Sequence, residues 1–420
     1  MFTKNRPKNK IAHRKTKKRI YPVIDETTIL SNAANDSVNN PIISKYAHKV
    51  ETSLTPKNMK EYATLIGIVT EKNISKYGQY SPSINKRLES IRHGKPVDIF
   101  GCGIESILRK TKNVDNFDIR IGSDSKGNDV CVSATSKDAR DVFMKNFKSN
   151  RPLIASKIIV PMQRHSNCWF NTMFICFFVS DKGRKFMRFF RQLMIEGKLV
   201  DGSLITPKEL SFAFILFNAA IEACYNNGKI KDTPWLALNT NNIIVNIYNS
   251  LPSMPGIKNI DEFGNPYNFY RDIMLYIGSK HNSITTELYN KESDVSSFYN
   301  SPDKNGITPD IVIVSITDNS NNRLAARTGN YLNKPLRVNY NGSIYEIDSV
   351  ISRDITKQHF CCGITCNSED YLFDGGAFSR LSKRNWRKWI NKDLFWRTHG
   401  STGDWNFTIG YSMFFYYRIS

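Results

Sequence analysis

The sequence predicts an α+β fold, in which a helical part is followed by a part built mainly of β-strands. Apolar segments with helical spacing lie between residues 167 and 277, whereas from residue 310 onward short β-rich runs alternate with turn residues. Hydrophobic residues make up 40% of the 420-residue chain, which is enough for a large core. The length allows one large domain with a tail, or two domains.

Residues 1–58 are expected to form a basic, partly disordered N-terminal arm. Residues 1–20 (MFTKNRPKNKIAHRKTKKRI) are basic and polar without an apolar period, and residues 21–58 are rich in Asn, Ser and Thr. The basic run makes residues 1–20 a candidate for contact with a polyanion or for nuclear localisation.

Residues 59–150 are predicted to form an accessory α/β region. Ser136 is a suitable N-cap for one of its helices, because its hydroxyl can accept a hydrogen bond from the first turn. The predicted elements are a helix at 59–69, a turn running into a helix at 98–110, strands at 117–121 and 129–133, and a helix at 136–147.

Residues 151–420 carry the strongest patterns and are predicted to form the main domain. Pro207 favours a helix start, and an Asn-Asn-Gly sequence at 226–228 favours its end. The predicted elements are a strand at 158–160, helices at 167–179, 185–195, 209–224 and 266–277, and strands at 310–316, 337–340, 343–350, 359–365, 371–373 and 411–418.

The formal net charge of +21 favours contact with nucleic acid, an anionic membrane face or an acidic protein. A solvated basic surface is the alternative. The longest apolar stretch, residues 170–179, is shorter than the roughly 20 residues of a membrane span, so we expect a soluble protein.

The eight cysteines, at 102, 131, 168, 176, 224, 361, 362 and 366, lack a repeated C-x-x-C pair at zinc-ligand spacing. A metal cluster of Cys361, Cys362 and Cys366 with His359 is disfavoured, because consecutive strand residues point to opposite faces. We therefore expect no metal and no cofactor. The N-terminus lacks a signal-peptide pattern, which predicts a reducing, intracellular compartment with most thiols free.

Cys168 follows a polar, turn-prone stretch and opens the apolar segment predicted to be a helix. The start of a helix carries partial positive charge and unpaired N–H groups, which favour a nucleophilic thiolate. The side chain of Gln163 and the N–H of Cys168 could donate to a developing oxyanion. The alternative is that Cys168 is a buried core thiol beside the core aromatics Trp169 and Phe170.

His359 leads a predicted strand, and Asp374 ends the next one. Antiparallel pairing of these strands would bring Asp374 beside His359, where a carboxylate orients the imidazole and stabilises its charged form. A Cys at a helix start, a strand-leading His and an Asp one hairpin later together predict nucleophilic catalysis.

These segments resemble the ubiquitin-specific protease group of papain-like cysteine peptidases. CWFNT at 168–172 is similar to the group's Cys box, and HF at 359–360 with YLFD at 371–374 is similar to its His box. The segments 309–316, 342–351 and 410–418 resemble its later strands, so that the resemblance covers residues 151–420.

The resemblance implies a papain-like fold, in which the helical part carries the Cys and an antiparallel sheet carries the His and Asp. It implies Cys168 as nucleophile, His359 as general base, Asp374 as orienting residue, and Gln163 at the oxyanion position, where the family often has Asn. The implied substrate is a ubiquitin or ubiquitin-like conjugate, or a viral precursor protein. The style of the sequence resembles divergent versions from large cytoplasmic DNA viruses, which implies the host cytoplasm or a virion.

The sequence also departs from this family. The paired-Cys zinc fingers and the Gln-Asp-Ala-x-Glu-Phe helix are not recognisable, and residues 266–277 stand in place of that helix. A catalytically silent peptidase fold that serves as a binding or virion structural module is therefore an alternative. Another is nucleic-acid binding through residues 1–20 and the Trp-rich basic segment 381–405, although packing of an amphipathic helix on the sheet explains that segment better.

Overall fold

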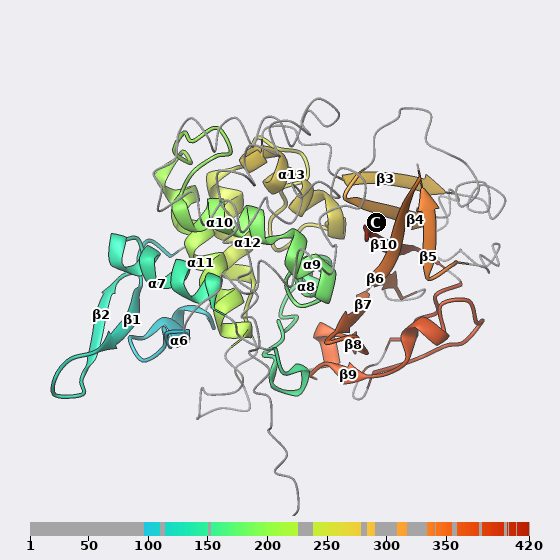
Figure 1. Ribbon diagram of the computed structural model, residues 1–420, viewed down its shortest axis with the longest axis horizontal. Coiled ribbons are helices and arrows are strands. Elements are labelled where there is room, and N and C mark those ends of the chain that lie inside the picture. Colours follow the sequence, from blue (N-terminus) through green and yellow to red (C-terminus); the bar gives the residue numbers. More distant parts are fainter. Residues whose placement is uncertain are drawn as a thin grey trace, which may run out of the picture.

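The computed structural model describes residues 96–109, 114–149, 153–225, 238–278, 309–316, 334–340, 342–354, 359–377, 380–398, 401, 403–408 and 410–419, and the backbone of 284–289. It has a helical half and a half built on one large sheet (Figure 1). The arm predicted for residues 1–58 and the helix predicted at 59–69 lie outside the described residues. The mixed α+β architecture expected from the sequence is confirmed within the described parts.

The helical half is built around two buried helices, α8 (Cys168–Phe178) and α11 (Lys208–Cys224). All residues of α8 are buried, which is consistent with a segment that is apolar on every side. Around them lie α6 (Ile104–Ile107), α7 (Lys137–Lys148), α9 (Asp181–Phe186), α10 (Arg188–Glu196), α12 (Asn241–Ser250) and α13 (Pro266–Gly278).

The large sheet has the strand order β3-β4-β10-β6-β7-β8-β9, and β5 pairs with β6. Its pairs are antiparallel except β3–β4, which is parallel and was not expected. The strands are β3 (Ile284–Tyr289), β4 (Ile311–Ile316), β5 (Arg337–Tyr340), β6 (Ser343–Arg353), β7 (Phe360–Cys366), β8 (Glu369–Phe373), β9 (Ser382–Lys383) and β10 (Ser412–Arg418).

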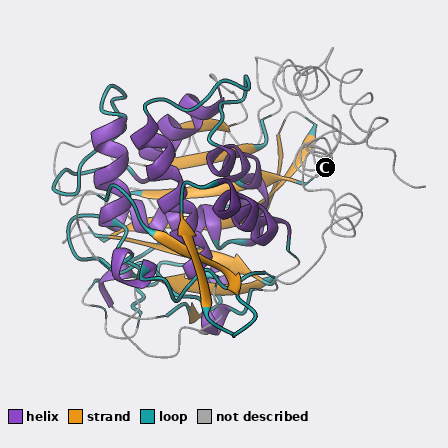
Figure 2. Cartoon of the chain, turned by 90° about the vertical axis from the view of Figure 1, so that its left-hand side faces the viewer, coloured by secondary structure: helices purple, strands orange, loops and turns teal. Residues whose placement is uncertain are grey.

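The sheet is buried on both faces. One face packs on the helices, as the view from the β1–β2 end shows (Figure 2), and the other covers a separate cluster that contains Trp386, Trp396 and Trp405. Cys362 belongs to the helix-facing cluster and Cys361 to the other, as expected for neighbours in a strand.

The described part of residues 59–150 forms a small hairpin of β1 (Asp118–Ser123) and β2 (Asp129–Ser133), followed by α7. Both strands and the helix were predicted, and the Ser136 side chain accepts a hydrogen bond from the Ala139 amide as the N-cap. Phe117 and Phe143 share the core cluster of the helical half. The division into an accessory region at 59–150 and a peptidase domain at 151–420 stays a prediction.

The expectation that most thiols are free is confirmed, with one disulfide as the exception. Cys102 and Cys131 form a disulfide, while the other six cysteines are free. The disulfide joins the turn before α6 to β2, where the Arg120 amide also bonds the Ile99 carbonyl. Among the described residues, no helix combines the length and apolarity needed to cross a membrane.

Two expectations are wrong in detail, and one helix was not predicted. Residues 158–160 are not a strand, because Ile159 bonds to the end of α11 and Val160 to Leu238. The helix expected at 185–195 is divided into α9 and α10 at Met187, whose ψ of −7° departs from α-helical geometry. Helix α12 was missed, because its Asn-rich and β-branched sequence has low helix propensity and tertiary burial outweighs that preference.

The Trp-rich segment does not form the expected amphipathic helix. It contains β9, a short 3₁₀ turn (Trp386–Lys388) and a single bridge between Trp396 and Trp405. Trp386, Trp396 and Trp405 are nevertheless buried against the sheet, so their packing role is confirmed.

Candidate active site

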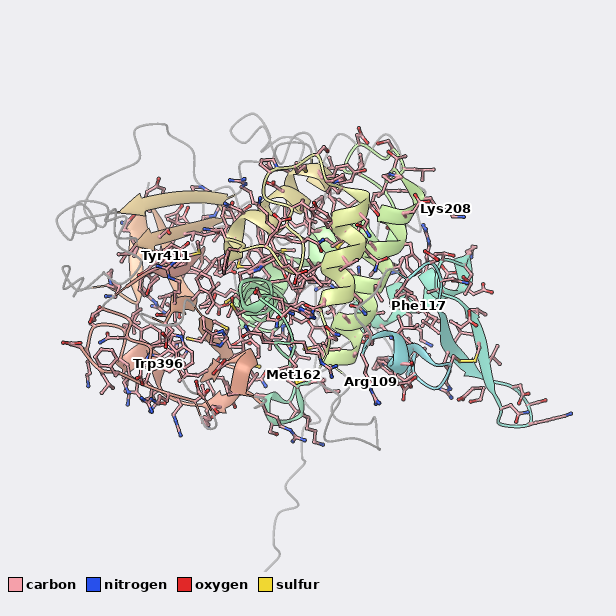
Figure 3. The ribbon with its side chains drawn as sticks, turned by 180° about the vertical axis from the view of Figure 1, so that it is seen from behind. Arg109, Phe117, Met162, Lys208, Trp396 and Tyr411 are labelled. Carbon is pink, nitrogen blue, oxygen red and sulfur yellow. A yellow bond between two sulfur atoms is a disulfide. The ribbon has the colours of Figure 1, made fainter. Side chains whose placement is uncertain are left out.

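Cys168 is the first residue of α8 and lies where the helical half meets the sheet. No side chain caps this helix at Asn167. Cys168 is 8% exposed, so it is nearly buried but keeps a small solvent-accessible area. Figure 3 places Met162, at the start of the segment that leads to Cys168, between the helices and the sheet half that carries Trp396 and Tyr411.

His359 and Asp374 are brought together by the β7–β8 hairpin. Cys362 pairs with Phe373 and Cys366 with Glu369, so the residue before β7 and the residue after β8 lie at the same end. The chain reverses at Asn367 and Ser368, whose φ values of 53° and 64° suit a tight two-residue turn. As a result His359 Nε2 and Asp374 Oδ1 are 2.6 Å apart.

Asp374 is almost completely buried, and its carboxylate accepts several hydrogen bonds. Its Oδ1 also accepts from the Gly376 amide at 2.8 Å, and its Oδ2 accepts from the Thr398 hydroxyl at 3.3 Å. Burial alone would raise the pKa of Asp374, but hydrogen bonds from His359, Ser401 and the Gly376 amide outweigh it and lower the pKa. Asp374 is therefore held as a carboxylate.

His359 links the carboxylate to the thiol. Burial opposes its charged form, but hydrogen bonds to Asp374 and to Cys168 outweigh this effect and raise the pKa of His359 to about 9. Since Nε2 contacts Asp374, Nδ1 is the ring nitrogen left for the thiol. The geometry thus joins the three residues in the order Cys168, His359, Asp374.

Gln163 is placed beside the turn that follows Asp374. Its backbone amide donates to the Gly375 carbonyl at 3.0 Å, which ties the segment before Cys168 to the His and Asp half of the site. Its side-chain Oε1 is buried without a hydrogen-bond partner. The bond to Gly375 is made by the backbone amide of Gln163, so the oxyanion role predicted for its side-chain N–H₂ stays a prediction.

The sequence did not indicate that the Trp-rich segment supports this site. Trp405 donates its indole N–H to the His359 carbonyl at 3.3 Å, and the two rings lie 5.8 Å apart. Thr398, between the two bridged tryptophans, donates to Asp374. Only tertiary contacts bring Trp405 close to His359 and Thr398 close to Asp374.

A buried Asn and Thr network beneath Cys168 was also missed. The Asn167 amide donates to Thr240 at 3.1 Å and to Asn241 at 2.6 Å, and the Thr240 hydroxyl bonds Asn171. All four residues are fully buried. The network fixes the start of α8 against α12, which explains why an Asn-rich segment is helical and buried there.

The loop between α12 and α13 contacts the segment around Cys168. Gly264 lies against the ring of Trp169, the neighbour of Cys168, so closely that an added methyl group would sit 2.3 Å from Trp169 Cδ2. His165 Nδ1 and Asp261 Oδ1 are 3.6 Å apart, which connects the same loop to the segment before Cys168.

Gly264→Ala is expected to destabilise the protein by about 1–3 kcal/mol, because the indole is enclosed by Phe170 and Phe269 and cannot move away. Thermal unfolding measures the effect. Phe263→Ala, at the exposed neighbouring position, should leave the midpoint unchanged. Equal midpoints for wild type and Gly264→Ala would show that the loop does not pack on Trp169 in this way.

Among the described residues, no group of three or more His, Cys, Asp or Glu side chains is arranged to hold a metal ion.

No protein-family model matches the chain, and no curated protein matches it. Among solved structures, it is similar to a chain of the SAGA Ubp8/Sgf11/Sus1/Sgf73 DUB module, with 11% identity, a TM-score of 0.37, and 63% of this chain and 68% of that chain covered. For the same module bound to ubiquitin aldehyde, the identity is 10% and the TM-score 0.38, with 70% of this chain and 77% of that chain covered. For the yeast SAGA DUB module with a tyrosine-to-alanine mutant of Sgf73, the identity is 9% and the TM-score 0.35, with 63% of this chain and 69% of that chain covered. With TM-scores below 0.5, the functional argument rests on the site itself.

Proposed function

We propose that this chain is a cysteine peptidase or isopeptidase with Cys168 as nucleophile, His359 as general base and Asp374 as the residue that orients His359. One observation carries the proposal: His359 Nε2 lies 2.6 Å from Oδ1 of the buried Asp374, and the same imidazole is close enough to Cys168, at the start of a helix, for that thiol to help raise the pKa of His359. Such a constellation activates a nucleophile in unrelated folds.

The proposed reaction begins when the Cys168 thiolate attacks the carbonyl carbon of a peptide or isopeptide bond. The His359 imidazolium then gives its proton to the leaving amine, and a thioester remains on Cys168. Water attacks the thioester while His359 takes a proton from it, so that the carboxylic acid product leaves and the Cys168 thiolate and His359 imidazolium are restored.

The tetrahedral intermediate carries a negative charge that needs donors. We assign this role to the backbone N–H of Cys168 and to the side-chain N–H₂ of Gln163, whose backbone amide is tied to the Gly375 carbonyl in the turn after Asp374. Removing one such donor typically costs 10²–10³-fold in kcat.

The proposed substrate is a ubiquitin or ubiquitin-like conjugate, with a viral precursor protein as the other candidate. This part of the proposal rests on the resemblance of residues 168–172 and 359–374 to the Cys and His boxes of ubiquitin-specific proteases. The same resemblance suggests a divergent viral type that acts in the host cytoplasm or the virion.

A ubiquitin probe with a C-terminal electrophile, applied to wild type and Cys168→Ala side by side, tests the proposal. A covalent adduct on the wild type alone supports a deubiquitinase. No adduct, with Cys168 still hyper-reactive toward iodoacetamide, supports a peptidase with another protein substrate. No adduct and no hyper-reactivity contradicts the peptidase and favours a silent, structural role.

A further inference from the structure

The described residues between Trp396 and Trp405 lie beside the proposed active site, and their two ends pair with each other. The Trp396 amide donates to the Trp405 carbonyl at 2.9 Å, and the Trp405 amide donates back to the Trp396 carbonyl at 3.2 Å. The two indole rings lie 5.2 Å apart, and both are buried against the sheet. We call these residues, 396–398, 401 and 403–405, the clamp. Its ends are fixed by this pairing and burial.

The clamp holds the backbone of His359 at its Trp405 end. The Trp405 indole N–H donates to the His359 carbonyl at 3.3 Å, and its ring lies 5.8 Å from the imidazole. The same carbonyl accepts from the Asp354 amide at 2.7 Å. The Asp404 amide of the clamp donates in turn to the Asp354 carboxylate at 2.6 Å. The clamp therefore restrains His359 both directly and through its neighbour in the chain.

The clamp also reaches the carboxylate of Asp374, through Thr398. The Thr398 hydroxyl donates to Oδ2 at 3.3 Å, and the two residues are only 5% and 1% exposed. His359 and the Gly376 amide both bond the other oxygen, Oδ1. A carboxylate held through one oxygen can turn about its Cβ–Cγ bond, because that torsion is soft, whereas a donor on the second oxygen fixes its plane. Ser401 of the clamp acts in the same sense, since its side chain helps to lower the pKa of Asp374.

We propose that Thr398 and Trp405 are positioning residues of the active site. Thr398 fixes the plane of the Asp374 carboxylate, and Trp405 fixes the backbone of His359, so that the imidazole stays directed at Cys168. The inference rests on the proposed function. If the clamp only covered the sheet, a hydroxyl at position 398 would have no use, because a valine fills the same volume without the cost of burying a polar group.

The first test measures the alkylation of Cys168 by iodoacetamide, resolved by mass spectrometry at neutral pH. Thr398→Val removes the hydroxyl and keeps the volume, so Cys168 should react about 10–100-fold more slowly. Thr398→Ser keeps the hydroxyl and should restore most of the wild-type rate. Trp405→Phe removes the indole N–H but keeps an aromatic ring, and it should also slow the reaction.

The second readout is independent of the thiol. In protein with isotope-labelled histidine, NMR follows the ring N–H of His359 that lies between Nε2 and Asp374 Oδ1. This proton should exchange with water faster in Thr398→Val than in wild type or Thr398→Ser. Thr408→Val is the matched control, because its buried hydroxyl bonds Asn406 at 2.8 Å. It should lower the thermal midpoint but leave the His359 signal and the Cys168 rate unchanged.

Equal Cys168 rates and His359 signals in wild type, Thr398→Val and Trp405→Phe would overturn the inference. So would an equal loss in Thr408→Val, because the effect would then reflect general destabilisation. Should Thr398→Val fail to fold, Trp405→Phe carries the test with the same two readouts. In these cases a Cys168 that still reacts far faster than the other free cysteines leaves the proposed function standing. A wild-type Cys168 that reacts no faster than they do would overturn the proposed function together with the inference.

Discussion

Cys168→Ala is expected to abolish hydrolysis while leaving the fold intact. Without the thiol no thioester can form, and loss of an enzymatic nucleophile lowers kcat by about 10⁶-fold in a well-studied case. The change removes one sulfur from the first residue of α8 and adds no atoms, so the structure should accept it. Hydrolysis of a fluorogenic ubiquitin amide, together with the circular dichroism spectrum, measures both effects.

Cys176→Ala is the matched control. Cys176 is a fully buried thiol two turns later on the same helix, on the side that faces Cys362 of β7. This variant should keep its activity. Hydrolysis that persists in Cys168→Ala would rule out Cys168 as the nucleophile, and equal loss in both variants would point to damage of α8 instead.

Asp374→Asn is expected to lower kcat by roughly 10⁴-fold, as the equivalent change does in a serine protease triad. The carboxylate both orients His359 and helps to hold its pKa at about 9, above the ordinary value of 6.5. The substitution should therefore bring the pKa of His359 down toward 6.5. NMR titration of the imidazole and the pH dependence of kcat/KM measure the change.

The sign of the stability effect follows from the raised pKa of His359. Protonated His359 stabilises the folded state fully below pH 6.5, and this contribution is lost as the pH rises through about 9. Asp374→Asn should reduce that pH dependence. Asp370→Asn, on the strand β8 that immediately precedes Asp374 but paired with Arg387, is the control and should leave the His359 titration unchanged. An unaltered titration in Asp374→Asn would contradict the proposed contact.

The parts of the site that could be predicted depend on local sequence. A polar stretch before an apolar helix identifies Cys168, and two short strands around a turn bring His359 and Asp374 together. Long apolar runs likewise predict α8 and α11, and short β-rich runs bounded by turn residues predict β7 and β10; all four elements are almost completely buried.

The parts that could not be predicted depend on contacts between residues distant in sequence. Thr398 reaches Asp374 across 24 positions, and Trp405 reaches His359 across 46. Thr240 meets Asn171 across 69 positions, and this network stabilises a helix that propensity disfavours. The packing of Gly264 against the Trp169 ring likewise has no signature in the sequence, because it joins the loop before α13 to α8.

The central claim is that His359 activates Cys168 in particular. The most direct test is the alkylation rate of each free cysteine by iodoacetamide, resolved by mass spectrometry, in wild type and in His359→Gln. Burial raises the pKa of the Cys361 and Cys362 thiols, and raises that of Cys366 to about 12, so these should react slowly. Cys168 should react far faster than the other five free cysteines and should lose this advantage in His359→Gln. Uniformly slow labelling, or fast labelling of Cys168 that His359→Gln leaves unchanged, would contradict the central claim.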